Sequence, residues 1–482
     1  MSSEERPGHL LDELSDALGD DARVILTGDL QRFSEPARGP AGHVDLVLAP
    51  ASTWQLRVII RWARDNRLQL IPQGANSGLV EASTPGPDDV AIILSTDRMV
   101  GEIVINASDR TAVVPAGTRL SKLNEELAPH GLQLPIDLGA DPSIGGMAAT
   151  NTGGARMIRH GDMRRHVLGI EAVLADDEVS VVDEISTLRK DNSGLSLTQL
   201  MVGSGGSLGV ITRVAVEVEP IPASTACAWL MPRDPQSVIA CLALLETRWG
   251  SHLSAFEVAS ANAMNAALDH VADLRDPFAQ IDSQTQGDPE LRVLIEFETL
   301  DATSARVDSA TAESFLISAL AALQETGLMV DAVIAPTEDA WRLRHSISEG
   351  LRLSGTVIGF DVSVPRSRLP DFLDQARSAV RREFPHASVA DFGHWGDGGV
   401  HCSVVIPFDE PLSAAERTRL RQLVFSIAVD DFGGTFSAEH GVGPANADWW
   451  RGSKSPGSQR LTHAIKAACD PLGILGHPRM PY

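Results

Sequence analysis

Two histidines in the C-terminal third of the sequence have the type and the surroundings of metal ligands. His394 and His401 are seven residues apart, and glycines occupy much of the interval between them. In an extended strand this spacing would point the two side chains to opposite faces, and the glycines disfavour a helix. We therefore expect a glycine loop that folds back and aims both imidazoles at one point.

Glu439 and His440 follow later in the chain and complete the candidate set. Adjacent side chains diverge on any regular element, so a shared site needs irregular backbone, which Gly441 and Gly443 permit. Two imidazoles and one carboxylate with an open position are the ligand set of a catalytic divalent-metal site, and His440 would then be free to move a proton. Spacing alone leaves the alternative open, because histidines near glycines are most often loop residues bonded to backbone.

The elements that must position these residues follow a boundary at Pro220-Ile-Pro222. Strand-like and helix-like segments alternate beyond it, which predicts an α+β domain with an antiparallel sheet and flanking helices. The predicted strands are 228–231, 291–298, 330–335, 358–364 and 401–406. The predicted helices are 302–323, 369–382 and 414–429, and the last of them leads to Glu439.

The N-terminal half has an α/β pattern after a predicted helix at 9–18 and an exposed arm. A strand at 44–48 precedes a helix that begins at Ser52, with Gln55 in a capping-box position. The strand at 68–71 runs into a loop of small residues, 72–78, whose backbone N–H groups could wrap a phosphate. Further strands are predicted at 90–94, 103–106, 111–114 and 167–175, with a helix at 120–127.

Two more tracts of small residues lie at 141–155 and 203–209. The tract at 203–209 is not a dinucleotide fingerprint, because Leu208 breaks the glycine spacing and the following residues alternate like a strand. Three such tracts in one α/β region indicate an extended cofactor that lies along several loops.

The length of the chain and its pattern of apolar residues limit the classes of protein to which it could belong. A chain of 482 residues is long enough for two or three domains. No run of about 18 apolar residues indicates a membrane span, and the first residues lack the basic start and apolar core of a signal peptide, so we expect a cytoplasmic protein.

Charge and cysteine content exclude further classes. The formal net charge of −24 argues against binding to nucleic acid or to an anionic membrane. An acidic substrate would have to be held by local arginines. The four cysteines contain no CxxC pair, which argues against a disulfide framework, a zinc ribbon or an iron–sulfur cluster.

Ordered motifs along the chain resemble those of FAD-linked oxidoreductases of the vanillyl-alcohol oxidase / p-cresol methylhydroxylase type. In the N-terminal half these motifs are PQGANSGL (72–79), IDLG (136–139), IGG (144–146), ATNTGG (149–154), VLGIE (167–171), VLAD (173–176), KDNSG (190–194) and GSGGSLG (203–209). The C-terminal half resembles the D-lactate and D-2-hydroxyglutarate dehydrogenase branch through GHWGDG (393–398), His401, AEHG (438–441) and DPLGIL (470–475).

The resemblance implies a domain order. An N-terminal helix and arm (1–40) precede a two-subdomain PCMH-type FAD-binding domain (41–222). A substrate or cap domain follows (223–430), and a C-terminal segment (431–482) completes the active site and returns to the FAD domain.

The resemblance also implies roles for individual residues. His394, His401 and Glu439 would bind a divalent metal, zinc or manganese, His440 would be the general base, and Arg344 and Ser348 would contact substrate. The residues that would bind FAD are Pro72, Gln73, Gly74, Ala75, Asn76, Ser77, Gly78, Leu79, Pro135, Leu138, Gly139, Ser143, Gly145, Gly146, Thr150, Asn151, Gly153, Gly154, His160, Gly161, Gly206, Val210 and Ile211. Asn76 stands where covalently flavinylated relatives carry a histidine, so we expect non-covalent FAD.

The implied reaction is oxidation of a D-2-hydroxy acid to the 2-oxo acid, with hydride transfer to flavin N5. The chain departs from the branch at four positions that are here glycine: Gly205, Gly359, Gly399 and Gly476. Gly359 replaces a lysine and Gly399 an asparagine near the substrate, which favours a larger or less charged hydroxy acid over a five-carbon diacid.

Two other readings stay open at this point. One is an FAD oxidase of a specialised alcohol, amine or sugar-like substrate that uses O₂ and requires no metal. The other is a flavoprotein subunit that only transfers electrons or binds a partner. The electron acceptor could be a flavoprotein, a quinone or O₂, and a homodimer is a family expectation.

Overall fold

The computed structural model describes residues 5–19, 24–28, 30–37, 39–279, 290–300 and 311–476, and it divides into two compact units. Unit 1 comprises residues 1–152, 162–220 and 440–482, and unit 2 comprises residues 153–161 and 221–439. The chain therefore leaves unit 1 for nine residues, 153–161, before it returns.

The first sheet of unit 1 has the strand order β1-β2-β4-β3, with β2 (His43–Leu48) and β3 (Leu70–Gln73) parallel to β4 (Val90–Ser95). The remaining elements are β1 (Ile25–Leu26), α1 (Glu5–Leu18), α2 (Gln31–Ser34) and α3 (Thr53–Asp65). Ser52 caps α3 by accepting a hydrogen bond from the Gln55 amide, as the sequence predicted. The apolar side of α3 packs on the sheet together with α1.

The second sheet of unit 1 is antiparallel and has the order β5-β6-β10-β8-β9. Its strands are β5 (Val104–Asn106), β6 (Thr111–Pro115), β8 (Val167–Val173), β9 (Val181–Asp183) and β10 (Val210–Glu217). A small ladder joins β7 (Leu132–Gln133) to β11 (Glu219–Pro220). The helices of this part are α4 (Leu120–Leu127), α5 (Ile144–Thr150), α7 (Met163–His166) and α8 (Leu197–Met201).

The C-terminal residues of the chain are integral to unit 1. After α15 (Ala447–Ser453) and α16 (Pro456–Cys469), Leu475 forms a parallel bridge with Leu70. The Lys466 ammonium donates to the carbonyls of Ser207 and Leu475, at 2.6 and 2.9 Å, and is paired with Asp470 at 2.7 Å. This ammonium therefore ties the third small-residue tract to the returning chain.

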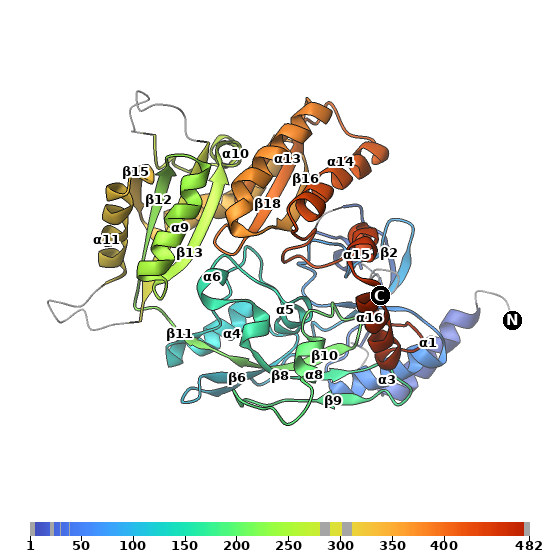
Figure 1. Cartoon of the computed structure of the whole chain (residues 1–482). Helices are drawn as coiled ribbons and strands as arrows, with labels where there is room; N and C mark the ends of the chain where they lie inside the picture. The colour runs from blue at the N-terminus through green and yellow to red at the C-terminus, as the bar shows by residue number, and fades with distance from the viewer. Residues whose placement is uncertain are drawn as a thin grey trace. The chain divides into compact units, whose positions relative to one another are not determined.

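Unit 2 is built on a seven-stranded sheet in the order β15-β12-β14-β13-β17-β18-β16, with every neighbouring pair antiparallel (Figure 1). Its strands are β12 (Ser224–Pro232), β13 (Leu253–Ser260), β14 (Leu291–Thr299), β15 (Met329–Ala335), β16 (Thr356–Ser363), β17 (Ser388–Gly393) and β18 (Gly399–Ile406). Its helices are α6 (Met157–His160), α9 (Pro235–Trp249), α10 (Ala261–His270), α11 (Ala312–Glu325), α12 (Thr337–Ser354), α13 (Leu369–Glu383) and α14 (Ala414–Ser426).

Helices cover both faces of this sheet. α10 and α12 contribute Met264, Trp341 and Ile347 to an apolar cluster with β12 to β14, while α9 and α11 contact the same strands (Figure 1). Every residue of β13 is buried, which requires cover on both sides because side chains alternate between faces. The predicted α+β class is confirmed.

Some predicted elements differ from the structure. Residues 302–310 of the predicted helix 302–323 lie outside the described residues, and α11 begins at Ala312. Residues 141–155 were not expected to be helical, but α5 forms within them because Ser143 caps it. Within the described ranges, no helix combines the length and apolar character needed to cross a bilayer.

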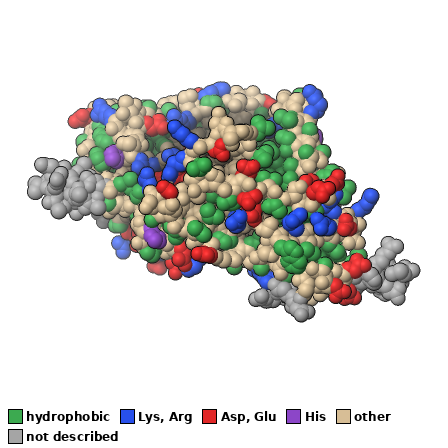
Figure 2. All heavy atoms as spheres, turned by 90° about the horizontal axis from the view of Figure 1, so that it is seen from below, with side chains coloured by type: hydrophobic (Ala, Val, Ile, Leu, Met, Phe, Trp, Pro, Cys, Tyr) green, Lys and Arg blue, Asp and Glu red, His purple; other side chains and the backbone are tan. Residues whose placement is uncertain are grey.

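One face of the molecule is visible in Figure 2. On this face acidic and basic side chains are interspersed among apolar ones.

Candidate active site

A β-hairpin in unit 2 brings the two predicted histidine ligands together. β17 ends at Gly393, the chain turns through His394 to Gly398, and β18 returns with His401 opposite Phe392. Gly398 has a φ of +97°, and a Cβ there would lie 2.8 Å from the Val364 carbonyl oxygen, so the turn requires glycine. The ring centroids of His394 and His401 are 5.1 Å apart.

Glu439 is held beside this hairpin by Asp361 of β16. Asp361 is the cross-strand partner of His401. Its carbonyl accepts from the Ala438 amide at 3.0 Å, and its Oδ2 accepts from the Glu439 amide at 2.9 Å. The irregular segment that carries Glu439 is thereby fixed to the strand next to His401.

Three side-chain atoms converge in the geometry of a metal site. Oε1 of Glu439 lies 3.7 Å from Nε2 of His394 and 3.5 Å from Nε2 of His401. These separations exceed ordinary hydrogen bonds. Ligand atoms about 2.1 Å from one ion are about 3.4 Å apart in a tetrahedral arrangement. The two distances from Glu439 therefore suit a divalent metal shared with either histidine.

Each histidine has a carboxylate on its other nitrogen. Nδ1 of His394 lies 2.7 Å from Oε1 of Glu257, and Nδ1 of His401 lies 3.8 Å from Oδ1 of Asp361. A carboxylate within hydrogen-bond distance in this position, as Glu257 is, orients a metal-binding imidazole and fixes its tautomer, whereas Asp361 makes only a longer ion-pair contact. Ligand atoms of Asp361, His401 and Glu439 also lie within 4.8 Å of one another, in a group that does not include His394. Asp361 also accepts the Glu439 amide through Oδ2 and lies 3.8 Å from Nδ1 of His401.

A buried ion pair between Glu257 and Arg344 lies next to His394. Glu257 is 1 % exposed, and its Oε2 accepts from Nε and Nη2 of Arg344 at 2.7 and 2.6 Å. Burial raises the pKa of Glu257, but the charges and hydrogen bonds of His394 and Arg344 outweigh this and lower it. Burial lowers the pKa of His394, and the charges of Glu257 and Glu439 raise it well above its usual value.

Asp397 in the hairpin turn is a further titratable group. Burial, opposed by the charge of His394, raises the pKa of Asp397 to about 6. Its Oδ1 accepts from the Gly399 amide at 2.8 Å, and a Cβ at Gly399 would lie 3.0 Å from the same atom. A side chain at position 399 would therefore require Asp397 to shift.

Arg344, Ser348 and His440 are the other residues predicted for this site. Arg344 is buried in its pair with Glu257, and Ser348 is exposed one turn later on α12. His440 follows Glu439 in the chain, is half-buried and begins the last segment of unit 1. Glu257 and Asp361 were not predicted as site residues. The signal for Glu257 was a lone acidic residue inside the apolar run of β13.

In unit 1 the three small-residue tracts pack against one another. The amides of Gly203 and Gly205 donate to the carbonyls of Ala148 and Ala149, at 3.0 and 2.7 Å. A Cβ at Gly74 would lie 2.5 Å from Oγ of Ser143, and Gly206 has a φ of +77° with Pro72 beside it. Such close backbone approach is available only to glycine, so the tracts form one continuous backbone surface suited to an extended cofactor.

The first tract is held by the N-terminal arm. Asn76 has a φ of 55°, its Nδ2 donates to the Glu35 carbonyl at 2.8 Å, and its Oδ1 accepts from the Ser83 hydroxyl. Gln73 donates to the carbonyls of Phe33 and Ser83. The hydrogen bonds of the Asn76 side chain thus stabilise the conformation of this loop.

Other residues predicted to bind FAD lie in β10 and in the segment 153–161. Val210 and Ile211 open β10 and pack in the cores of unit 1. Gly153, Gly154, His160 and Gly161 belong to the segment 153–161 of unit 2, where Nε2 of His160 lies 3.3 Å from Glu298.

Two protein-family profiles match the chain. The FAD binding domain matches residues 44–183, and the C-terminal domain of FAD linked oxidases matches residues 221–477. Together they span both units.

Curated relatives align over most of their length. The mitochondrial D-2-hydroxyglutarate dehydrogenase of Arabidopsis thaliana is 35 % identical over 90 % of this chain and 74 % of its own. The mitochondrial enzyme of that name from Bos taurus is 34 % identical over 91 % and 77 %. D-2-hydroxyglutarate dehydrogenase of Stutzerimonas stutzeri is 30 % identical over 89 % of both chains.

Solved structures share the fold. p-Cresol methylhydroxylase superposes with a TM-score of 0.71 at 14 % identity, covering 99 % of this chain and 96 % of its own. Alkyldihydroxyacetonephosphate synthase superposes with a TM-score of 0.72 at 16 % identity, covering 98 % and 86 %.

Proposed function

The chain belongs to the FAD-linked oxidoreductases, as its sequence motifs indicated, and we propose that it oxidises a D-2-hydroxy acid to the 2-oxo acid with the help of a divalent metal. The relatives with 30–35 % identity that are named D-2-hydroxyglutarate dehydrogenases support the reaction class. The observation that carries the metal is the convergence of Nε2 of His394, Nε2 of His401 and Oε1 of Glu439.

Each residue of the site has a task in this proposal. His394, His401 and Glu439 would hold the metal, Glu257 keeps the His394 imidazole oriented, and Asp361 lies beside that of His401. When bound, the metal would supply Lewis acidity at the substrate hydroxyl, and FAD would accept the hydride from the α-carbon. His440 takes the hydroxyl proton at its imidazole. Loss of one proton and one hydride converts the hydroxy acid to the 2-oxo acid.

The substrate proposal rests on what surrounds the metal site. The guanidinium of Arg344 is already neutralised by Glu257, and positions 359 and 399 are glycine. A second substrate carboxylate would need its own cation to be buried without a large cost. We therefore favour a D-2-hydroxy acid whose distal part is larger or less charged than that of D-2-hydroxyglutarate.

We also propose that FAD is held without a covalent bond, because Asn76 offers no nucleophile and is engaged with Glu35 and Ser83. The backbone surface of the three tracts fits the cofactor.

An anaerobic spectral titration tests the reaction. The purified holoenzyme is mixed with single members of a panel of D- and L-2-hydroxy acids, and the flavin absorbance is recorded. The proposal expects bleaching by one or more D-acids and none by their L-enantiomers. Failure of the whole panel to bleach the flavin would reject it, and reduction by an alcohol or amine instead would favour an oxidase.

A further inference from the structure

Two buried carboxylates on neighbouring strands of unit 2 bond the same helix. Glu257 on β13 pairs with Leu294, and Glu296 on β14 pairs with Ala255, so the two glutamates point to one face of the sheet at diagonal positions. Helix α12 faces them with Trp341 and Arg344, which are three residues apart and hence on one side of the helix. Trp341 donates to Glu296, and Arg344 donates to Glu257, both at 2.7 Å.

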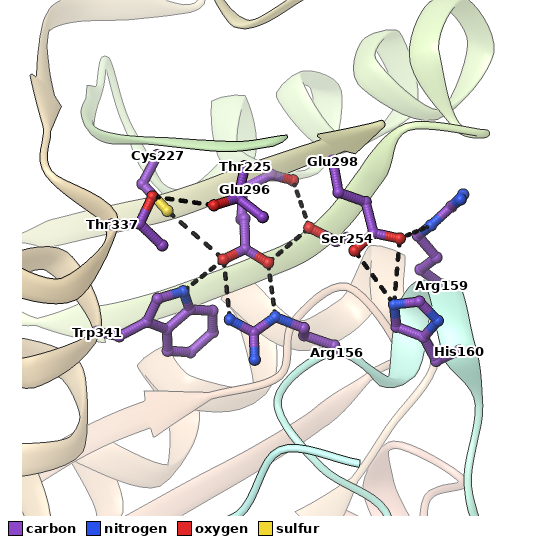
Figure 3. Close-up of polar contacts among 10 residues, drawn as sticks. All are labelled: Arg156, Arg159, His160, Thr225, Cys227, Ser254, Glu296, Glu298, Thr337 and Trp341. Atoms are coloured by element: carbon purple, nitrogen blue, oxygen red, sulfur yellow. Dashed lines mark hydrogen bonds and ion pairs between the residues drawn. The ribbon is translucent and has the colours of Figure 1, made fainter. Parts of the chain in front are cut away.

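Figure 3 shows the polar contacts of Glu296. Glu296 is fully buried, and Arg156 binds it in bidentate fashion, with Nε to Oε1 at 2.6 Å and Nη2 to Oε2 at 2.9 Å. The Ser254 hydroxyl donates to Oε1 at 2.7 Å. The guanidinium of Arg156 also lies over the Trp341 ring, 4.7 Å from its centroid. A buried carboxylate with this many donors holds each of them in one geometry.

Arg156 comes from the segment 153–161, which lies along the candidate metal site. A Cβ on Gly153 would lie 3.5 Å from Oε2 of Glu439, and a Cβ on Gly396 would lie 3.0 Å from Cδ1 of Ile158. The segment therefore touches a ligand residue at one end, the hairpin turn in its middle and Glu296 through Arg156.

We propose that Arg156 and Glu296 form a positioning pair for the metal site. Arg156 fixes the carboxylate of Glu296, which accepts the hydrogen bond from Trp341 and so positions α12. Arg344 on the same helix binds Glu257, and Glu257 orients His394 through Nδ1. This inference rests on the proposed function, since it assigns the pair to the metal site described above. The pair touches neither a ligand atom nor the reacting groups, so it acts through other residues.

The same strand and the same segment provide a matched control (Figure 3). Glu298, two residues after Glu296, is 2 % exposed and binds Arg159 and His160. Within the described part of the chain, the carboxylate of Glu298 contacts residues of the segment 153–161 and no residue of α12. A Glu298→Gln variant therefore loses a buried ion pair of the same kind while the Trp341 contact remains.

The experiment compares Glu296→Gln, Trp341→Phe and Glu298→Gln in the full chain loaded with FAD. Zn²⁺ affinity is measured by competition with a chromogenic chelator, and amide hydrogen exchange is measured for α12. We expect Glu296→Gln to weaken Zn²⁺ binding about 10-fold and Trp341→Phe by a smaller factor, because partners outside the ligand shell tune affinity on this scale. Glu298→Gln should change Zn²⁺ binding less than twofold. Exchange in α12 should quicken in the first two variants only.

The thermal midpoint separates positioning from general stability. Glu296→Gln and Glu298→Gln should lower it to a similar extent, since each leaves buried arginine donors without a carboxylate. Equal effects of these two variants on Zn²⁺ affinity and on α12 exchange would overturn the proposal. Wild-type Zn²⁺ affinity and wild-type exchange in Glu296→Gln would do so as well. Trp341→Phe removes the N–H donor to Glu296 and shortens the ring, while the ion pair of Arg156 with Glu296 remains, and this variant decides the matter if Glu296→Gln does not fold.

Failure of the proposed function would look different. A wild-type protein that binds no Zn²⁺, or that no hydroxy acid reduces, rejects the metal-assisted reaction. The exchange of α12 amides in the same variants then still shows whether Arg156 and Glu296 hold this helix.

Discussion

Nδ1 of His394 lies 2.7 Å from Oε1 of Glu257, and Arg344 binds the other oxygen of that carboxylate. Glu257 is buried, and within the described residues His394 and Arg344 are the charged partners that lower its pKa. With Nδ1 engaged, Nε2 of His394 faces Glu439. The candidate metal site is therefore connected to the core of the sheet through Glu257 as well as to the hairpin.

Replacing Glu257 by glutamine should weaken metal binding. The change keeps the volume but removes the negative charge that orients His394 and pairs with Arg344. Loss of such an outer partner costs about 10- to 100-fold in metal affinity. Chelator competition with Zn²⁺ measures the change, with Glu298→Gln as the control buried carboxylate. Unaltered affinity in Glu257→Gln would show that Glu257 does not orient a ligand.

Replacing His401 by alanine should remove the metal and leave the flavin. His401 contributes one of the three converging atoms, all of which belong to unit 2. We expect less than one tenth of the wild-type metal content by elemental analysis, with the FAD absorbance per chain unchanged. His386→Ala is the control, because His386 lies beside Glu410 and not in this cluster. Full metal content in His401→Ala would place the ion elsewhere.

Acid precipitation should release all of the flavin. Asn76, at the position where some relatives carry a flavin-linked histidine, bonds Glu35 and Ser83 and offers no nucleophile. After precipitation with trichloroacetic acid, the yellow chromophore is expected in the supernatant. A pellet that stays fluorescent after denaturing electrophoresis would reveal a covalent bond at another residue.

Unit 1 should lose stability in acid through Glu171. This buried carboxylate on β8 accepts from Thr53, Thr212 and Arg213. Burial raises the pKa of Glu171, but these hydrogen bonds and the Arg213 charge outweigh it and hold the pKa below its usual value. The resulting stabilisation is present above about pH 4.5 and is lost as the pH falls through the lowered folded pKa.

The Glu171→Gln variant isolates this contribution. We expect it to cost about 1–2 kcal/mol of unfolding free energy at pH 7, and the difference from wild type should shrink below about pH 4.5. Flavin fluorescence during urea unfolding follows unit 1. Glu217→Gln, whose ion pair with Arg189 is exposed, serves as the control and should change little. A pH-independent deficit in Glu171→Gln would assign the loss to packing.

Local signals in the sequence predicted many elements well. Helix α4 spans the predicted residues 120–127, and Ser52 caps α3 as its spacing with Gln55 indicated. The fold-back expected between His394 and His401 is a hairpin turn in which Gly398 adopts a positive φ. These features depend on short-range backbone preferences, which the residue types reveal.

The residues that contact the candidate metal ligands could not be predicted from such local signals. Asp361 meets His401 through strand register, and Glu257 meets His394 across 137 positions of the chain. Such contacts depend on how the strands are ordered in the sheet. The segment 153–161 continues a glycine tract of unit 1 yet packs in unit 2, because Arg156 and Arg159 find buried glutamates there.

The rate of flavin reduction with and without metal tests the central claim most directly. The holoenzyme is treated with EDTA, checked for full FAD content, and mixed anaerobically in a stopped-flow instrument with the D-2-hydroxy acid that reduces it fastest. We expect reduction to slow at least 100-fold without metal and to recover when one equivalent of Zn²⁺ or Mn²⁺ is added. Equal rates for the metal-free and reconstituted enzyme would contradict a metal-assisted oxidation at His394, His401 and Glu439.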